Sequence, residues 1–190
     1  MKIYGFGFLS FVIAALMIGA ITPLMAASGD VFGQVGVVNI GDGGGTHASV
    51  GGGASGMIGS NFAVFGELNY IPTGDYGMST SSVGISTKIL QVGGGVRVYI
   101  PKGMKNLRLY VPVAGGVLRW SVGATASGVS VSTSVNGGYF GTGFGAEIGN
   151  KFGVRPEFRY DRYQLSFGGI SSGSNVISVG AGVFYRFGAK

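Results

Sequence analysis

The chain has 190 residues, enough for one domain, and combines 40 glycines and 46% hydrophobic residues with only 11% charged residues. Soluble domains carry about 25% charged residues, so this composition predicts apolar surface that faces lipid, and the lack of a Gly-X-Y period excludes collagen. The net charge of +6 comes without a Lys/Arg cluster, and cysteine is absent, which argues against a nucleic-acid partner, disulfides and thiolate metal sites. No residue pattern indicates a cofactor or another metal site.

The first residues have the pattern of a secretory signal peptide. Lys2 precedes an apolar stretch at 3–21, and small residues follow at Ala26 and Ala27. This order predicts a signal peptide at 1–27 that is cleaved near Ala26 or Ala27. A retained helical anchor is the alternative, because the apolar stretch is about as long as the ~18 residues that span a membrane.

The remaining residues, 28–190, form one domain of predicted strands. Short apolar runs recur between turn residues without a helical period, and they predict eight strands near 30–40, 47–58, 61–71, 87–100, 106–119, 134–149, 152–165 and 175–187. The connections alternate between tight (59–60, 101–105, 150–151) and longer (41–46, 72–86, 122–133, 166–174). Outer-membrane barrels have short periplasmic turns and longer outer loops. The predicted fold is therefore all-β, an eight-stranded antiparallel up-and-down transmembrane β-barrel.

Charged and apolar side chains alternate with period two along several of these strands, most clearly at 154–161. In a strand, alternate residues lie on opposite faces, so the charged face carries Glu67, Arg97, Arg108, Glu147, Arg155, Glu157, Arg159, Asp161 and Arg186. These four acids and five bases nearly cancel, and burying them unpaired would cost several kcal/mol each. We therefore predict that they pair inside the barrel as a lumen polar network.

The opposite arrangement, a soluble ligand-binding barrel with the apolar face inside, is the competing prediction. It would expose a glycine-rich face to water and would leave the low charge content without a reason. In the lipid-facing arrangement the other face is apolar throughout, and the inner glycines leave room for long arginine side chains.

Two prolines, Pro112 and Pro156, fall inside predicted strands. Proline removes a hydrogen bond from a sheet that has no edge once it is closed. A bulge at Pro112 would reverse the facing of Arg108 relative to Arg119.

The pattern resembles the small eight-stranded outer-membrane barrels, the OmpA-like and OmpX-like β-barrel family. Residues 155–161 are similar to the charged penultimate strand of that family, and the end of the last strand is similar to the C-terminal signal read by the barrel-assembly machinery, with Gly182, Tyr185 and Phe187 at its characteristic positions. The chain departs from that signal at Ala181, where a polar residue is usual, and in the three residues after the last aromatic. The resemblance implies location in the cell outer membrane, with outer-membrane lipids and the assembly machinery as partners. We expect a monomer.

An eight-stranded barrel encloses an interior just wide enough for side chains. We therefore expect a plugged lumen and a structural or surface-interaction role, with a narrow pore as an alternative. His47 and Ser49 share a strand face, and outer-membrane lipid A deacylases use a similar pair with an acid. The acid nearest in the sequence is Asp42, and the surrounding residues do not match that family. We therefore expect no enzymatic activity and keep a lipid-modifying enzyme as the other alternative.

Three cations lie at the loop ends of predicted strands with the parity of lipid-facing residues: Lys88, Arg119 and Arg162. Charge on that face is tolerated near the interfaces, where it costs about 0–1 kcal/mol. At the outer leaflet the three would meet lipopolysaccharide phosphates, which predicts a lipopolysaccharide-binding rim. Ordinary placement of long cationic side chains at an interface explains them equally well.

Overall fold

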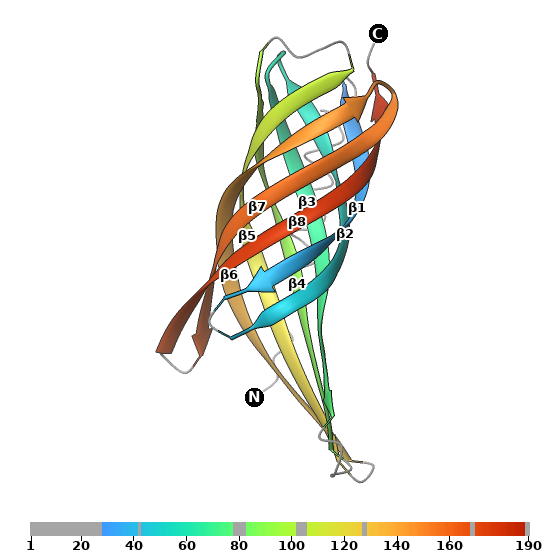
Figure 1. The fold of residues 1–190 in the computed structure, drawn as a ribbon. Helices are drawn as coiled ribbons and strands as arrows, with labels where there is room; N and C mark the ends of the chain where they lie inside the picture. The colour runs from blue at the N-terminus through green and yellow to red at the C-terminus, as the bar shows by residue number, and fades with distance from the viewer. Residues whose placement is uncertain are drawn as a thin grey trace.

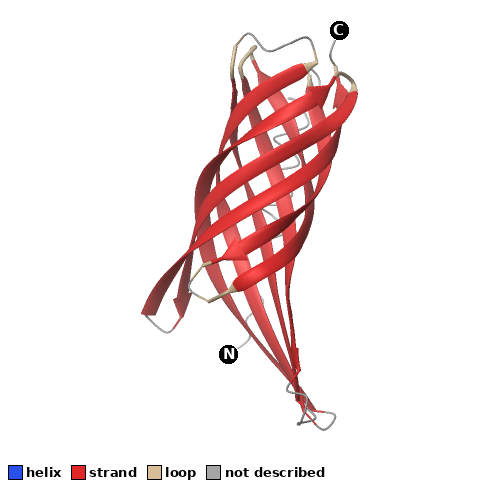
Figure 2. Ribbon diagram, viewed as in Figure 1, coloured by secondary structure: helices blue, strands red, loops and turns tan. Residues whose placement is uncertain are grey.

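The computed structural model describes residues 28–41, 43–77, 83–101, 106–126, 129–167 and 170–188, so the expected signal peptide at 1–27 lies outside the described residues. The strands are β1 (Gly29–Ile40), β2 (Gly45–Ile58), β3 (Phe62–Gly77), β4 (Val83–Tyr99), β5 (Leu107–Ala126), β6 (Val129–Gly149), β7 (Phe152–Phe167) and β8 (Ile170–Phe187). Each strand pairs antiparallel with the next, and β8 pairs with β1, which closes the barrel (Figures 1 and 2). The predicted eight-stranded up-and-down barrel is confirmed. Within these described ranges, no helix is long and apolar enough to cross a membrane.

The strands run further toward one end of the barrel than the sequence predicted. β3 continues to Gly77, β5 continues to Ala126, and β6 begins at Val129. The expected long loops are therefore wrong, because most of their residues pair in hairpins. We call this lower end of Figure 1 the loop end; its connections are 41–44, 78–82, 127–128 and 168–169. The opposite end is the turn end; its connections are 59–61, 100–106 and 150–151.

Pro112 does not change the facing of β5. Buried and exposed residues continue to alternate across it, and the pairing with β6 keeps one register on both sides. Arg108 therefore faces inward and Arg119 faces outward. A register shift lies instead between Pro72 and Gly74, where β3 pairs with β4.

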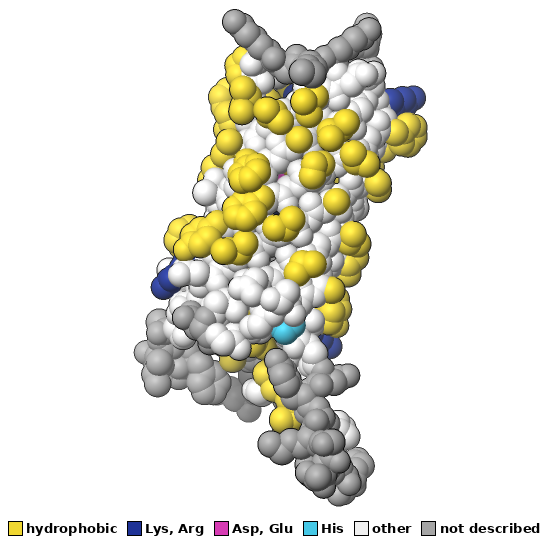
Figure 3. All heavy atoms as spheres, in the orientation of Figure 1, with side chains coloured by type: hydrophobic (Ala, Val, Ile, Leu, Met, Phe, Trp, Pro, Cys, Tyr) yellow, Lys and Arg dark blue, Asp and Glu magenta, His cyan; other side chains and the backbone are white. Residues whose placement is uncertain are grey.

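Over most of the barrel the outward side chains are apolar. Large exposed hydrophobic residues occur on every strand, for example Val35 on β1, Phe144 on β6 and Val179 on β8, which are 63%, 64% and 57% exposed. Figure 3 shows these side chains spread in yellow from the turn end at the top toward the loop end. Monomeric soluble proteins rarely expose a contiguous apolar patch larger than a few hundred Å². The outer surface is therefore built to contact something other than water.

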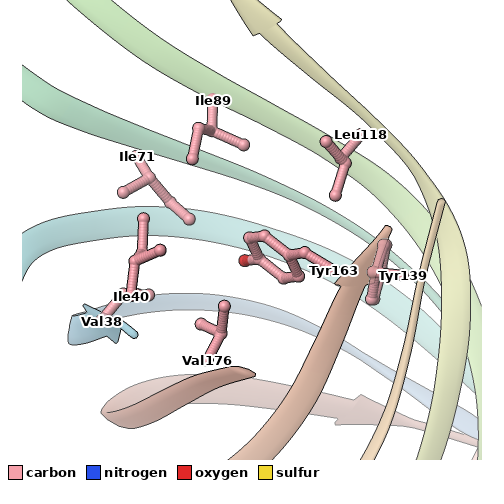
Figure 4. Packing of buried hydrophobic residues seen from close by; sticks show 8 residues of the cluster. All are labelled: Val38, Ile40, Ile71, Ile89, Leu118, Tyr139, Tyr163 and Val176. Atoms are coloured by element: carbon pink, nitrogen blue, oxygen red, sulfur yellow. The ribbon is translucent and has the colours of Figure 1, made fainter. Parts of the chain in front are cut away.

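Over the same length the inner face carries charged and polar side chains among aromatic rings, and it becomes apolar toward the loop end. Buried residues from seven strands form one cluster there, which we call the loop-end cluster: Val38, Ile40, Ile71, Ile89, Leu118, Tyr139, Tyr163 and Val176. Figure 4 shows these side chains directed into the barrel interior. The expectation that only the outer face is apolar is therefore wrong at this end.

The outer face changes in the opposite sense at the same level. Along β5 the outward residues are Val113 and Val117, then Arg119 and Ser121, whereas the inward Leu118 is only 2% exposed. Neighbouring strands also turn polar side chains outward near this level, at Asn39, Lys88, Asn136, Arg162 and Asn175. The barrel is thus apolar outside and polar inside over most of its length, and the reverse at the loop end.

Candidate functional site

All nine charged residues of the expected lumen network point into the barrel. Six are buried and three, Arg108, Glu157 and Arg186, are partly buried. Asp30 joins them and is 3% exposed, although sequence reasoning missed it. The signal that could have revealed it is the period-two pattern of the first strand, which places Asp30 and Gln34 on the same face. With Asp30 included, the inward acids and bases are equal in number.

Glu147 is the centre of the network near the turn end. Its Oε1 atom accepts hydrogen bonds from the Tyr99 hydroxyl at 2.8 Å and from Arg155 Nη2 at 3.0 Å, and its Oε2 atom accepts one from Arg186 Nη2 at 2.6 Å. Arg155 Nη2 also donates to Asp30 Oδ1 at 2.7 Å. One guanidinium from β7 therefore connects buried carboxylates of β1 and β6 across the interior.

A second group of ion pairs lies further toward the loop end. Arg159 donates from Nη1 to Glu67 Oε1 at 2.5 Å and from Nη2 to Asp161 Oδ1 at 3.1 Å. The Tyr139 hydroxyl donates to the same Glu67 oxygen at 3.2 Å. Charge-assisted bonds of this kind are about twice as strong as neutral ones, so this group links β3, β6 and β7.

Two arginines of the network rest mainly on aromatic rings. The guanidinium carbon of Arg97 lies 4.7 Å and 4.5 Å from the ring centroids of Phe32 and Phe65, and that of Arg108 lies 3.8 Å from the Tyr99 centroid. Arg97 is 1% exposed, and a desolvated cation–π contact stabilises by about 2 kcal/mol. The aromatic residues therefore replace part of the hydration that these cations lose.

Two inner glycines provide room for tyrosines, whereas the sequence predicts that the inner glycines leave room for arginines. Gly93 faces the hydroxyl of Tyr139, and Gly145 faces the ring of Tyr110; a Cβ atom at either glycine would overlap the ring or hydroxyl. The Tyr110 hydroxyl then reaches Glu157 Oε2 at 2.6 Å. Gly93 and Gly145 therefore let the phenol groups of Tyr139 and Tyr110 enter the charged network as donors.

The interior near the second ion-pair group contains a small polar cavity. Its volume is about 40 Å³, and side chains that line it include Gln34, Asn69, Gln91, Glu157, Arg159 and Asp161. A volume of ~10–15 Å³ holds one water, so this space accommodates a few small molecules and no large solute.

Two of the three expected rim cations lie together. Lys88 and Arg119, on adjacent strands, border one outward groove of about 530 Å³ that also has apolar and hydroxyl side chains in its lining. Arg119 Nη2 donates to Ser134 Oγ at 3.0 Å. Arg162 lies apart on β7, where its Nη1 atom donates to Asn175 Oδ1 at 2.6 Å.

His47 and Ser49 share the inner face of β2 near the loop end, where the histidine is visible in cyan in Figure 3. A ring nitrogen of His47 hydrogen-bonds with the carbonyl oxygen of Gly44, and no carboxylate among the described residues bonds to it. Asp42, the acid nearest in sequence, lies outside the described residues. The described chain also places no group of three His, Cys, Asp or Glu side chains to hold a metal ion.

The residues of the expected assembly signal lie in β8. Phe187 pairs with Gly29, the first residue of β1, at the turn end. The rings of Tyr185 and Phe152 are 4.8 Å apart between centroids, and Gly182 lies in the same strand. The last strand of the chain is therefore the one whose pairing with β1 closes the barrel.

The model of one protein family, described as the outer membrane protein beta-barrel domain, matches residues 11–187. The chain belongs to this family. It is therefore an outer-membrane protein, and the soluble-barrel alternative is wrong. Comparison with curated proteins found no match.

Solved structures of outer-membrane proteins share this fold. Ail, the attachment invasion locus protein of Yersinia pestis, is 16% identical with a TM-score of 0.60 over 86% of this chain and 100% of its own. Neisserial surface protein A is 12% identical with a TM-score of 0.61 over 85% and 99%, and the N-terminal barrel domain of Pseudomonas aeruginosa OprF is 12% identical with a TM-score of 0.50 over 82% and 97%. A second Ail structure is a complex with the heparin analogue sucrose octasulfate. At these identities the likeness shows the fold alone.

Membership of this family explains the change in the two faces of the barrel. The apolar outer band contacts acyl chains, and an outer-membrane barrel carries such a band about 25 Å tall. In the outward series of β5, Arg119 and Ser121 come next after Val117, and we therefore expect the outer boundary of the hydrocarbon near Arg119. A boundary at this level places the strands beyond it in water, which accounts for the apolar residues that turn inward there.

Proposed function

We propose that this protein is a monomeric, non-enzymatic barrel with a structural or surface-interaction role, and that its lumen is closed to general diffusion. The observation that carries the proposal is that two layers of different chemistry cross the interior. The ion pairs around Glu147 and Arg159 fill one layer, and the loop-end cluster fills the next. A narrow pore would require both layers to move aside.

Conductance across planar lipid bilayers tests the closed lumen. The unmodified protein should give no steady stepwise current. A double variant, Glu67→Ala with Arg159→Ala, removes the second ion-pair group and widens the interior. Its conductance is compared with that of the unmodified protein. A stable open channel in the unmodified protein would contradict the proposal.

We further propose that Lys88, Arg119 and Arg162 contact lipopolysaccharide phosphates. The support is the position of Lys88 and Arg119 around one groove near the outer boundary, with Leu90 toward the apolar band and Ser121 toward water. Arg and Lys are the side chains that bind phosphates most effectively. The complex of Ail with a sulfated sugar shows a polyanion on a similar fold, which adds support for an anionic ligand.

Lipopolysaccharide co-purification tests this rim. Replacing Lys88, Arg119 and Arg162 together by Gln should reduce the lipopolysaccharide that remains bound after extraction, and the pair Lys88 and Arg119 should account for most of the loss because they share the groove. Lys151→Gln, at the turn end, is the matched control and should retain the lipid. Unchanged retention in the triple variant would remove this proposal.

The barrel-assembly machinery is proposed to read Gly182, Tyr185 and Phe187 in the closing strand. Phe187→Ser should lower the amount of folded barrel in the membrane, whereas Phe152→Ser, which removes the packing partner of Tyr185 without touching the signal, should lower it less.

A lipid-modifying enzyme has weaker support, because His47 bonds to a backbone carbonyl. The test of this alternative is a lipid A deacylation assay of the unmodified protein and of a Ser49→Ala variant. If both deacylate equally, Ser49 is not the nucleophile.

A further inference from the structure

The charges of the lumen balance over the whole barrel but not level by level. In the second ion-pair group Arg159 pairs with both Glu67 and Asp161, and it is the base that does so within the described part of the chain. Glu157, two residues before Arg159 on the same face of β7, bonds to the neutral hydroxyl of Tyr110. Three acids therefore share one base at this level. We call Glu67, Glu157, Arg159 and Asp161 the acidic group.

The compensating positive charge lies nearer the turn end. Four bases and two acids point into the barrel there: Arg97, Arg108, Arg155, Arg186, Asp30 and Glu147. Arg155 is six residues from Asp161 on β7, which is about 20 Å along a β-strand. The hydrocarbon around the barrel contains no water that could screen the difference. The acidic group thus has a local surplus of two negative charges.

The small polar cavity of the lumen adjoins this surplus. Glu157, Arg159 and Asp161 all line it. Asp161 is only 4% exposed, and its Oδ1 atom accepts a hydrogen bond from Arg159. Among the described residues no donor bonds to its Oδ2 atom. Burying a charged oxygen without a partner is costly, so this carboxylate requires a positively charged partner in the adjoining cavity.

Amide and hydroxyl oxygens complete the polar lining. Gln91 donates from Nε2 to the Tyr163 hydroxyl at 2.7 Å, and Gln34 donates from Nε2 to Asn69 Oδ1 at 2.8 Å. Both amides use their nitrogen in these bonds, which leaves the carbonyl oxygen of each for a ligand. All four side chains line the cavity. Carboxylate, carbonyl and hydroxyl oxygens are the ligands that hard cations prefer.

We propose that this cavity binds one small monovalent cation, sodium or potassium, between the carboxylates of Asp161 and Glu157, with the carbonyl oxygens of Gln34 and Gln91 and one or two waters as further ligands. The volume of about 40 Å³ has room for these, because each water-sized particle takes ~10–15 Å³. The bound ion offsets part of the surplus charge of the acidic group.

A divalent ion fits the same cavity less well. Arg159 is part of the lining, and its charge repels a divalent ion twice as strongly as a monovalent one. Within the described ranges, His, Cys, Asp and Glu side chains do not come together in threes as they would at a divalent site. The charge and the oxygen ligands therefore favour sodium or potassium.

Refolding in two chloride salts tests the site. The protein is refolded from urea into phosphatidylcholine vesicles at one ionic strength, in potassium chloride or in N-methylglucamine chloride, whose cation is too large for the cavity. The equilibrium constant for unfolding should be about tenfold smaller in potassium chloride, as expected when the ion is present at about ten times its dissociation constant. Equal constants in the two salts would overturn the proposal, because water or a proton would then occupy the cavity.

Two variants of equal size assign the effect to the cavity. Asp161→Asn removes the charge beside the cavity and should remove most of the difference between the salts. Glu147→Gln makes the same change at a buried acid that does not line the cavity; it should lower stability in both salts and keep the difference. A difference that persists in Asp161→Asn, or that disappears equally in both variants, would overturn the proposal.

Rubidium identifies the ion directly and needs no variant, so it decides the question even if Asp161→Asn does not fold. Crystals of the unmodified protein refolded in rubidium chloride should show an anomalous scattering peak in the cavity, beside Asp161 and Gln91. Density for ordered water without an anomalous peak would overturn the proposal. A gain in stability in calcium chloride that potassium chloride does not reproduce would do the same. These readouts do not involve lipopolysaccharide or conductance, so this inference and the proposed function can fail separately.

Discussion

The ionic part of the lumen and the loop-end cluster are two solutions to the same packing problem. Near the turn end, the space inside is filled by Glu147, Arg155 and their partners, which bond to one another. Near the loop end it is filled by Ile71, Ile89, Leu118 and their neighbours. The charged residues of the one layer and the apolar residues of the other come from the same seven strands, so the difference does not come from topology.

The difference follows from what surrounds the barrel at each level. Within the bilayer the outer face is already apolar, and lipid offers no hydrogen bonds to the backbone or to charged groups. Polar side chains are therefore satisfied inside. Beyond the bilayer the outer face meets water, and burying Leu118 and its neighbours inside contributes the usual ~25 cal/mol per Å² of apolar surface. The facing of the residues reverses because the surrounding solvent changes.

The largest expected effect comes from breaking the ionic layer. Glu147→Ala removes the acceptor shared by Tyr99, Arg155 and Arg186. Removing one partner of a buried ion pair costs about 3–5 kcal/mol, so the free energy of unfolding in lipid vesicles, measured with urea, should fall by that amount. A decrease below about 1 kcal/mol would mean that the network contributes little to stability.

A somewhat smaller loss is expected from the apolar layer. Leu118→Ala opens a cavity in the loop-end cluster and should lower the free energy of unfolding by about 2–5 kcal/mol. Val117→Ala, its neighbour on the outward face, serves as the control, because Val117 is 56% exposed and leaves no internal cavity. Equal losses in the two variants would show that the loop-end cluster is not a packed core.

The third prediction compares the apolar band of the outer face with the polar part of the outer face at the loop end. Val179→Arg places a cation on the apolar band and should destabilise the barrel by up to about 2–4 kcal/mol, depending on depth, whereas Ser132→Arg, beyond the expected boundary, should cost about 0–1 kcal/mol or less. Equilibrium unfolding in vesicles of both variants measures the difference. Similar costs at the two positions would place the membrane boundary elsewhere.

Period-two alternation predicted the facing of the charged residues because it is a local property of the sequence. The segment 154–161 shows it directly, and Arg155, Glu157, Arg159 and Asp161 all point inward. The strand ends were missed for the opposite reason. Residues 119–134 are rich in Gly, Ser and Thr, which resemble loop residues, and only their pairing across the hairpin makes them strands.

Only the part of the site that depends on local alternation could be predicted from the sequence. The charges of the network were visible one strand at a time, whereas their tyrosine partners and the separation of Arg162 from Lys88 depend on how distant strands are staggered around the barrel. The pocket lined by Trp120, Val135 and Leu165 also combines residues of β5, β6 and β7. No local pattern contains that information.

The reversal of facing near Arg119 is tested most directly by spin labels along β5. The chain has no cysteine, so single cysteines at 113, 117, 118, 119 and 121 can each be labelled in the protein in lipid vesicles. Labels at 113 and 117 should be relaxed mainly by oxygen dissolved in lipid, labels at 119 and 121 mainly by a water-soluble nickel complex, and the label at 118 by neither. Strong oxygen accessibility through residue 121, or at residue 118, would contradict the account.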